Sequence, residues 1–455
     1  MGQGFFGARD VPARSASTER SALECFNPHA ASEALRAGTA RAPLLPDPSA
    51  RDAAPSPFEL AQPQAVLPVS SIGQAAPVLA SAVLAMRHRQ YLSAWLSLAW
   101  LGLAPGLAAQ YSIVDLGDLG GGFSRAWAIN PSGQVAGESL LPGPPTIDRA
   151  FSWQGTMTDL GTLGGQQSAA FGINSAGTVS GWAQNAAGNA MPALWNGTSV
   201  SALPTLGGTS GTAWGINDAG TAVGVSALST GFSHATVWNG TGAHDLGTLG
   251  GPYSVAYDLN NQGTEVGTAS NSSGQDRAVF WGQNGPVDLG GLSGGNWTAV
   301  RQINESGEVI LWGTPHGGTV NQAAFWDGNP ASPVIELGAF GGSESWAFGL
   351  NDHGFVVGWA EEANGTYHAY VWDGTEKTDL GTLGGFYSSA FGINDQGVIV
   401  GYALDPEGNT HAVEWVPAPE PGPLALGLMG GVLLVFFGPQ VGRRCPQRAA
   451  SANCT

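Results

Sequence analysis

The stretch DLGTLGGFYSSAFGINDQGVIVGYA, residues 379–403, decides the fold, because residues 159–183 repeat most of it as DLGTLGGQQSAAFGINSAGTVSGWA. Five more stretches share this pattern, and successive starts lie 43 to 48 residues apart. The seven units begin at Asp115, Asp159, Ala202, Asp245, Asp288, Glu336 and Asp379. A repeat of this length cannot bury a core alone, so the seven units are expected to fold together as one domain.

Two further features recur in every unit. The first is an Asn-x-x-Gly sequence preceded by Ile or Leu, at Asn130, Asn174, Asn217, Asn260, Asn304, Asn351 and Asn394. The second is a tryptophan near the end of the unit, at Trp153, Trp195, Trp238, Trp281, Trp326, Trp372 and Trp415. The chain therefore supplies its own internal alignment.

Each unit has the pattern of four short strands. Two apolar runs flank an Asn/Asp/Gly turn, and a second hairpin follows around an Asp-Gly pair such as 373–374. In the run HAYVW, residues 368–372, both faces of the strand carry apolar side chains, so both sides of the sheet should be covered. Stacked sheets of four strands and 40–45 residues are typical of a β-propeller.

The two ends of the repeat region predict how the ring closes. The last unit finishes after its third strand at Trp415, and an extra strand, YSIVDLG at 111–117, precedes the first full unit. We therefore predict an all-β fold, a seven-bladed β-propeller of four-stranded blades in which the N-terminal strand completes the last blade. The alternative is an open β-solenoid, whose coils are usually shorter than 43 residues and need no such strand.

Charge and cysteine content exclude several functions for the repeats. Residues 110–422 hold 27 acidic and 5 basic side chains, a net charge of −22. Binding to nucleic acid requires clustered cations, so a nucleic-acid partner is not expected. Because Cys25, Cys445 and Cys454 all lie outside the repeats, the domain has neither a disulfide framework nor a cysteine metal site.

The N-terminal region is typical of an export signal. Residues 86–109 combine Arg87 and Arg89, an apolar run and small residues before a cleavage site after Ala108 or Ala109, as in a secretory signal peptide. The Ala/Pro/Arg-rich residues 1–85 then form either a wrongly assigned start, with Met86 as the true one, or a disordered leader.

The C-terminal region, residues 417–444, has three parts in order. They are Pro419-Glu420-Pro421, the apolar stretch 423–438 and Arg443-Arg444, followed by a tail over residues 445–455. This order resembles the PEP-CTERM sorting signal of Gram-negative bacteria. The resemblance implies processing by an exosortase, transient membrane contact and a secreted or cell-surface location. A plain C-terminal membrane anchor is the alternative.

The units themselves, residues 110–416, resemble the HAF repeats of bacterial extracellular proteins, named for a His-Ala-Phe run ahead of the tryptophan. That run is RAFSW at 149–153, HATVW at 234–238, HAYVW at 368–372 and HAVEW at 411–415. The resemblance implies an exported repeat protein and supplies no catalytic residues. Because the first position of the run varies between His, Arg, Gln and Met, we expect no shared chemistry there.

The regular polar and aromatic positions are interpreted as structural. An Asn in such a turn usually bonds its own backbone, and seven equivalent tryptophans are expected in the core between blades. The G-x-S-x-G match around Ser293 lacks the strand-turn-helix context of a nucleophile. No calcium-loop or zinc-site pattern is present, so no metal and no cofactor are predicted.

Unit five breaks the repeat and holds the weak candidates for binding. Arg301 stands where the other units have an aromatic residue, and the run EVILWGTPHGG at 308–318 contributes Glu308 and Trp312. Drift in a tolerant blade is the favoured explanation of these differences, because loops accept insertions at little cost.

Three functions remain open at this stage. The favoured one is a non-enzymatic surface or matrix interaction module, with extracellular polysaccharide as a partner. The second is a glycan-active hydrolase or lyase that uses carboxylates around unit five. The third is a multivalent lectin with equivalent sites in most blades.

Overall fold

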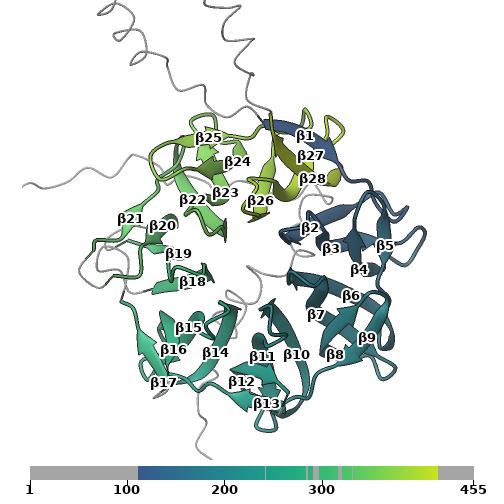
Figure 1. Ribbon diagram of the computed structural model, residues 1–455, viewed down its shortest axis with the longest axis vertical. Coiled ribbons are helices and arrows are strands. Elements are labelled where there is room, and N and C mark those ends of the chain that lie inside the picture. The colour runs from purple at the N-terminus through teal and green to yellow at the C-terminus, as the bar shows by residue number, and fades with distance from the viewer. Residues whose placement is uncertain are drawn as a thin grey trace, which may run out of the picture. The chain divides into compact units, whose positions relative to one another are not determined.

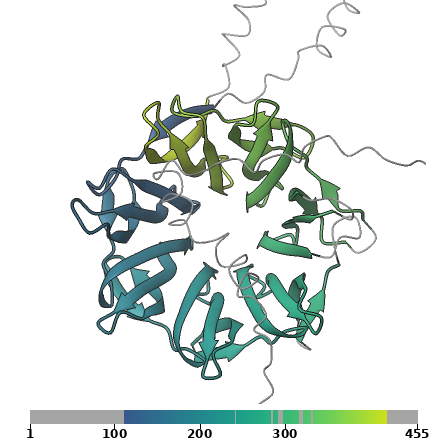
Figure 2. The same ribbon diagram turned by 180° about the vertical axis from the view of Figure 1, so that it is seen from behind.

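The computed structural model of the protein describes residues 111–418, apart from residues 241, 283–284, 291–296, 316–319 and 330–331. In this part of the chain, 28 strands form seven four-stranded antiparallel sheets, and no helix is present. The sheets stand around a central axis, so the fold is a seven-bladed β-propeller (Figure 1). The fold predicted from the repeats is thereby confirmed, and Figure 2 shows the same ring from behind.

In blades 1 to 6 the four strands follow one another from the centre of the ring outwards, and in blade 7 three strands do so while the first strand of the described chain lies outermost (Figure 1). The innermost strands of blades 1 to 7 are β2 (Ser124–Ile129), β6 (Gly164–Ile173), β10 (Gly207–Ile216), β14 (Gly250–Leu259), β18 (Trp297–Ile303), β22 (Gly341–Leu350) and β26 (Ser388–Ile393). The second strands are β3 (Val135–Leu140), β7 (Thr178–Asn185), β11 (Ala222–Leu228), β15 (Glu265–Asn271), β19 (Val309–Thr314), β23 (Val356–Glu362) and β27 (Ile399–Leu404).

The two outer positions complete each blade. The third strands are β4 (Asp148–Trp153), β8 (Ala190–Asn196), β12 (Ser233–Asn239), β16 (Asp276–Gly282), β20 (Gln322–Trp326), β24 (Tyr367–Trp372) and β28 (Thr410–Pro417). The outermost strands are β5 (Met157–Asp159), β9 (Ser199–Ala202), β13 (Gly242–Asp245), β17 (Gly285–Asp288), β21 (Ile335–Glu336), β25 (Lys377–Asp379) and, in blade 7, β1 (Tyr111–Asp115).

The ring closes as the ends of the repeat region predict. Strand β1 pairs antiparallel with β28, from Tyr111 opposite Pro417 to Asp115 opposite Val413. In Figure 1 the blue β1 lies beside the yellow-green strands of blade 7. The first and last described strands therefore share one sheet, which joins the two ends of the ring by backbone hydrogen bonds.

The core lies between neighbouring blades. Trp195 of blade 2 is fully buried, in a cluster that includes Ala136 and Ala150 of blade 1. Five of the seven unit-end tryptophans are buried, namely Trp195, Trp238, Trp281, Trp372 and Trp415. The other two, Trp153 and Trp326, are half-buried. The core interpretation holds for these five, and small alanines on the facing blade make room for the indoles.

Close packing within a blade depends on one glycine in its second strand. At Gly224 a Cβ atom would lie 1.9 Å from the carbonyl oxygen of Thr212, so no larger residue fits this backbone. Glycine occupies the same place in six blades, at Gly137, Gly181, Gly224, Gly267, Gly358 and Gly401. Blade 5 has Leu311 there, paired with Val300, and so departs from the other blades in its inner half.

Hydrogen bonds from the HAF run also join blades. The N–H of Ala235 donates to the hydroxyl of Ser254 in the next blade over 2.9 Å, and that hydroxyl donates to the carbonyl of Gly247 over 2.8 Å. The same bond from Ala412 to Ser124, over 2.9 Å, joins blade 7 to blade 1. The alanine of the run therefore has a structural role.

The predicted terminal signals lie outside the described residues. These include the signal peptide at 86–109, the residues Pro419, Glu420, Pro421, Arg443 and Arg444, and the apolar stretch 423–438. Within residues 111–418, apart from the gaps given above, no helix is long and apolar enough to span a membrane.

Candidate functional site

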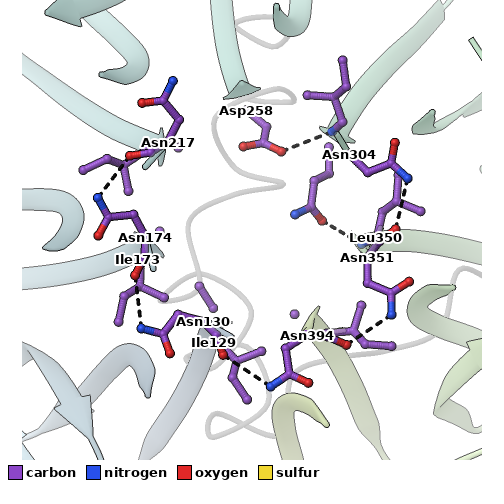
Figure 3. Close-up of a pocket in the computed structure, with 18 of the residues that line it drawn as sticks. Ile129, Asn130, Ile173, Asn174, Asn217, Asp258, Asn304, Leu350, Asn351 and Asn394 are labelled. Atoms are coloured by element: carbon purple, nitrogen blue, oxygen red, sulfur yellow. Dashed lines mark hydrogen bonds between the residues drawn. The ribbon is translucent and has the colours of Figure 1, made fainter. Parts of the chain in front are cut away.

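The candidate site is a central pocket of about 330 Å³ to which all seven innermost strands and their turns contribute (Figure 3). From each strand into its turn, successive residues line the pocket in five layers, although Asn260 and Gly349 are not part of the lining. In most blades they are an aromatic residue, a small residue, an Ile or Leu, the Asn of the repeat and, at the mouth, a polar residue, which is replaced by Pro131 in blade 1. Each layer can therefore be compared blade by blade.

The seven repeat asparagines form a closed ring of hydrogen bonds, and Figure 3 shows six of them, without Asn260, and the bonds that join these six. Each side-chain Nδ2 donates to the backbone carbonyl of the Asn in the next blade over 3.1 to 3.3 Å. The last bond runs from Asn394 to Asn130 and joins blade 7 to blade 1. All seven side chains are buried, so these bonds form away from water.

The same asparagines also shape their own turns. The Oδ1 atom of Asn217, for example, accepts the N–H of Thr221 over 3.0 Å, and the N–H of Gly220 donates to the Asn217 carbonyl. Gly220 has a φ of 78°, in the left-handed region that favours glycine. The structural interpretation of Asn-x-x-Gly is thus confirmed, with a bond between blades in addition.

A second set of bonds lies at the mouth of the pocket, one residue after the asparagines. The N–H of Glu305 donates to Asp352 over 2.9 Å, and the N–H of Asp352 donates to Asp395 over 3.0 Å. In the same way the N–H of Ser175 donates to Asp218, that of Asp218 to Asn261, and that of Asn261 to Glu305. The pattern stops at blade 1, because Pro131 has no N–H to donate. Four of the seven residues at the mouth are acidic, namely Asp218, Glu305, Asp352 and Asp395.

At the first layer, a β-bulge points one side chain of each innermost strand into the pocket. The pairing of β10 with β11, for example, skips Trp214 between Ala213 and Gly215, and the equivalent residue is skipped in every blade. A bulge redirects the extra residue away from the regular alternation of the strand. The seven skipped residues, called here the aromatic collar, are Trp127, Phe171, Trp214, Tyr257, Arg301, Phe348 and Phe391.

Six of the collar residues are aromatic and contact their neighbours around the ring. Ring centroids lie 4.3 Å apart for Trp127 and Phe391 and for Phe171 and Trp214, and 4.9 to 6.1 Å apart for the other adjacent pairs. All seven collar side chains are half-buried. They therefore present aromatic surface to the pocket while their packing limits their freedom.

Blades 4 and 5 interrupt this symmetry. Arg301 stands in the collar with its Cζ 5.3 Å from the ring centroid of Tyr257 and 5.7 Å from that of Trp214. In the next layer, where the other blades have Gly or Ala, blade 4 has Asp258 and blade 5 has Gln302. Both reach the following blade, since Asp258 accepts the N–H of Ile303 over 3.2 Å and Gln302 accepts that of Leu350 over 2.8 Å.

The charges of these two residues depend on their burial. Burial raises the pKa of the Asp258 carboxyl from 3.8 to about 7, although the N–H groups of Ile303 and Leu259 and the charge of Arg301 lower it. Burial also lowers the pKa of the Arg301 guanidinium, while Tyr257 and Asp258 raise it. The pocket therefore holds a carboxyl group that changes its charge near neutral pH beside a cation.

The three residues of unit five proposed from the sequence do not share the pocket. Arg301 lines it, whereas Glu308 lies in the turn and accepts the amide of Asn304 over 2.6 Å. Trp312 is only 3 % exposed and stacks on Trp346 with centroids 3.9 Å apart. Ser293 lies outside the described residues.

Sequence reasoning missed two features of the chemistry. The first is Asp258, which the internal alignment reveals as an acid in a column of small residues. The second is a side-chain pair between the first residue of the HAF run and the Asp of the DLG sequence, an ion pair for Arg149 with Asp159 over 3.4 Å and a hydrogen-bonded pair for His234 with Asp245 over 2.8 Å.

These side-chain pairs also follow a pattern in the sequence. The five blades with an Asp at the DLG start have His or Arg in the run, paired as Arg149–Asp159, His234–Asp245, Arg277–Asp288, His368–Asp379 and His411–Asp115. Where Ala202 replaces the Asp, Met191 replaces the base, and Glu336 likewise occurs with Gln322. The two columns vary together because the residues face each other across adjacent strands.

Comparison with known proteins finds only distant structural similarities. No protein-family model and no curated protein matches the chain. Among solved structures, it is similar to a putative TolB from Agrobacterium tumefaciens, at 12% identity and a TM-score of 0.37, over 68% of this chain and 100% of that one.

Two further structures are similar to the same extent. They are a sialidase from Trypanosoma rangeli, at 12% identity and a TM-score of 0.34 over 73% of this chain and 61% of that one, and the Aleuria aurantia lectin. The lectin matches at 9% identity and a TM-score of 0.32, over 69% of this chain and 97% of that one. Similarities this distant carry no argument about function.

Proposed function

We propose that this protein is an exported, non-enzymatic interaction module whose central pocket binds the end of an extracellular polysaccharide chain. The observation that carries this proposal is the aromatic collar, in which six half-buried rings and Arg301 surround one pocket. Aromatic faces combine a large apolar area with a fixed orientation, which suits the flat apolar face of a sugar ring.

The polar groups of the pocket support binding over reaction. The seven asparagine side chains, which are its most regular polar feature, are used in the bonds between blades and in their own turns. The polar groups that differ from blade to blade are concentrated at Asp258, Arg301 and Gln302. A ligand end would orient its hydroxyl groups against this side of the pocket.

Charge favours a neutral polysaccharide over an acidic one. Four acidic residues surround the mouth, and the repeat region carries a net charge of −22. An anionic chain would be repelled before it reached the collar.

Export and sorting complete the proposal. The signal peptide at 86–109 would direct the chain across the inner membrane. The segment from Pro419 to Arg444 would then be recognised by an exosortase, which leaves the propeller at the cell surface or in the extracellular matrix of a Gram-negative bacterium. Epitope-tagged protein in fractionated cells tests this step, since it should be found in the cytoplasm once residues 86–109 are deleted.

The binding proposal is tested by a glycan array and a polysaccharide-degradation screen on the same purified protein. We expect binding of one chain end per protein without new reducing ends. Trp127→Leu should weaken binding about tenfold or more, because it removes a collar ring. The matched control is Trp359→Leu, a half-buried tryptophan that also contacts two aromatic rings but does not line the pocket.

Two other outcomes of these binding experiments would contradict the proposal. Several sugars bound per chain would support a multivalent lectin with sites in most blades. Equal loss of binding in both tryptophan variants would place the ligand outside the pocket.

A glycan-active hydrolase or lyase remains the second candidate because of Asp258. A carboxyl group with a pKa of about 7 inside a pocket could transfer a proton at neutral pH. This candidate predicts new reducing ends or unsaturated products in the screen, and their loss in Asp258→Asn. Retained turnover in that variant would remove Asp258 from the mechanism.

A further inference from the structure

Three ligand-type side chains converge at the outer edge of blade 6. The Nδ1 atom of His368 lies 3.0 Å from Oδ2 of Asp379 and 3.5 Å from Oε1 of Glu362. One nitrogen or oxygen from each of the three residues lies within 4.8 Å of the other two. We propose that Glu362, His368 and Asp379 bind one divalent transition-metal ion of the Zn²⁺ class, independently of any ligand in the central pocket.

The spacing of these atoms suits a metal ion held between them. When nitrogen and oxygen ligands lie about 2.1 Å from a metal, neighbouring ligand atoms in tetrahedral or octahedral geometry are about 3.0–3.4 Å apart. The two distances from His368 Nδ1, 3.0 and 3.5 Å, are close to this range. The Glu362 and Asp379 oxygens lie within 4.8 Å of each other, so metal binding requires the Glu362 side chain to move until this third distance also fits.

Both carboxylates are already oriented by hydrogen bonds to their other oxygen. Oδ1 of Asp379 accepts the N–H of Gly381 over 2.8 Å, which leaves Oδ2 for the site. Oε2 of Glu362 accepts the amide of Asn364 and the hydroxyl of Thr366, each over 3.2 Å, which leaves Oε1 for the site. Such outer hydrogen bonds hold metal ligands in position and raise metal affinity.

The mixture of ligands decides the class of ion. One imidazole and two carboxylates suit Zn²⁺, Co²⁺ or Mn²⁺ better than Ca²⁺, which prefers six to eight oxygen ligands. The side chains of His368, Glu362 and Asp379 are 20 %, 27 % and 40 % exposed, so water can fill the remaining coordination positions.

The other blades show why the site belongs to blade 6. His234 and Asp245 form the same pair in blade 3, but Leu228 occupies the turn position of Glu362 and offers no ligand. In blade 7, Asp115 contacts Nδ1 of His411 and Asp405 contacts its Nε2, so one ion cannot take all three. In the remaining described pairs the base is Arg, which does not bind metals.

A bound ion would link three consecutive parts of blade 6. Glu362 ends β23, His368 lies in β24 and Asp379 ends β25. Strand β25 is only three residues long, so its edge position depends on few backbone bonds. Metal binding to the folded state would therefore stabilise the outer half of this blade.

The test uses Co²⁺, whose absorption spectrum reports coordination, and Zn²⁺ titrated calorimetrically into the full chain. We expect one ion per chain and a visible Co²⁺ absorption band. Glu362→Gln keeps the side-chain volume and should weaken binding about tenfold or more. The matched pair Asp379→Asn and Asp245→Asn should differ, because only the first removes a proposed ligand.

A gain-of-site variant makes the test independent of folding defects. Leu228→Glu in blade 3 places a third ligand beside His234 and Asp245 and should raise the stoichiometry to two ions per chain. The proposal is overturned if no Co²⁺ or Zn²⁺ binds, or if binding is equally strong in Glu362→Gln. Equal losses in Asp379→Asn and Asp245→Asn would also overturn it, because the ion would then lie elsewhere.

Discussion

The asparagine ring and the aromatic collar line the same pocket but differ in how strictly the sequence repeats. All seven asparagines are identical, and their bonds form a closed circle of seven. The collar tolerates Trp, Phe and Tyr and has Arg301 in one blade, with Asp258 close to it in the next layer. Each asparagine holds two blades together, so none of the seven can be replaced without loss. The collar residues only pack against one another, so a single blade can carry a charged residue in place of an aromatic one.

The strictness of the ring has a geometric cause. Each Asn side chain donates to one blade and accepts within its own turn, so the loss of one amide leaves a buried carbonyl and a backbone N–H without their partners. A collar ring only loses aromatic contact when it changes. The two layers therefore predict different results for equivalent substitutions.

The largest effect is expected in the ring. Asn174→Ala removes the bond to the Asn217 carbonyl and the bond from the Thr178 N–H, and should lower the free energy of unfolding by roughly 2–4 kcal/mol. Chemical denaturation measures this value. The control is Asn185→Ala in the same blade, where the side chain caps a turn without joining blades. Equal losses in both variants would mean that the bond between blades adds nothing.

The next effect is a pH dependence caused by Asp258. Its pKa is about 7 in the folded protein and 3.8 in the reference state, so the folded state holds a proton that the unfolded state releases. Stability from this residue is fully present below pH 4 and is lost progressively as the pH rises from 4 towards 7.

Asp258→Asn isolates that contribution because it is neutral at every pH. Thermal unfolding of both proteins between pH 4 and pH 8 should show wild type losing stability relative to the variant. Parallel curves would show that Asp258 ionises at an ordinary pKa.

A smaller and more specific effect is expected when the collar is made regular. Arg301→Phe restores the aromatic residue of the other blades and should leave the stability unchanged or slightly raised. It should weaken polysaccharide binding about tenfold, or about 1.4 kcal/mol. It should also raise the pKa of Asp258, because the charge of Arg301 lowers it. Carboxyl ¹³C NMR follows that pKa, and unchanged binding would exclude Arg301 from the site.

Most of the fold could be predicted from the sequence because the signals are local and repeated. The 43-residue spacing, the paired hairpins and the single extra strand at 111–117 define seven closed blades, and the structure confirms them. Internal repetition replaces an alignment, since each unit tests the interpretation of the others.

The contents of the pocket could be predicted only in part. Arg301 is visible as an exception in its column, but Asp258 matters through its burial and through the N–H of Ile303, 45 residues away. The bond from each Asn to the next blade also joins residues more than 40 positions apart. Distances of this kind depend on how blades pack, which no local pattern records.

The side-chain pairs of the HAF run are easier to predict from the sequence than the pocket, but harder than the fold. In four of the five pairs the partners are ten or eleven residues apart on adjacent strands, as for Arg149 and Asp159 or His234 and Asp245. The joint replacement by Met191 and Ala202 in blade 2 would have revealed the pairing. Each aligned position of the repeat, taken alone, does not show this pairing, because the signal is that two positions change together.

The smallest effect follows from this pairing. Asp245→Asn keeps the hydrogen bond to the N–H of Gly247 and removes only the charge that faces His234. Because the pair is partly exposed, we expect a loss of about 0.2–1 kcal/mol in the free energy of unfolding. A double-mutant cycle with His234→Gln measures the pair itself. A coupling energy as large as the loss in Asn174→Ala would contradict the comparison, because the surface pairs would then hold the propeller together as firmly as the buried ring does.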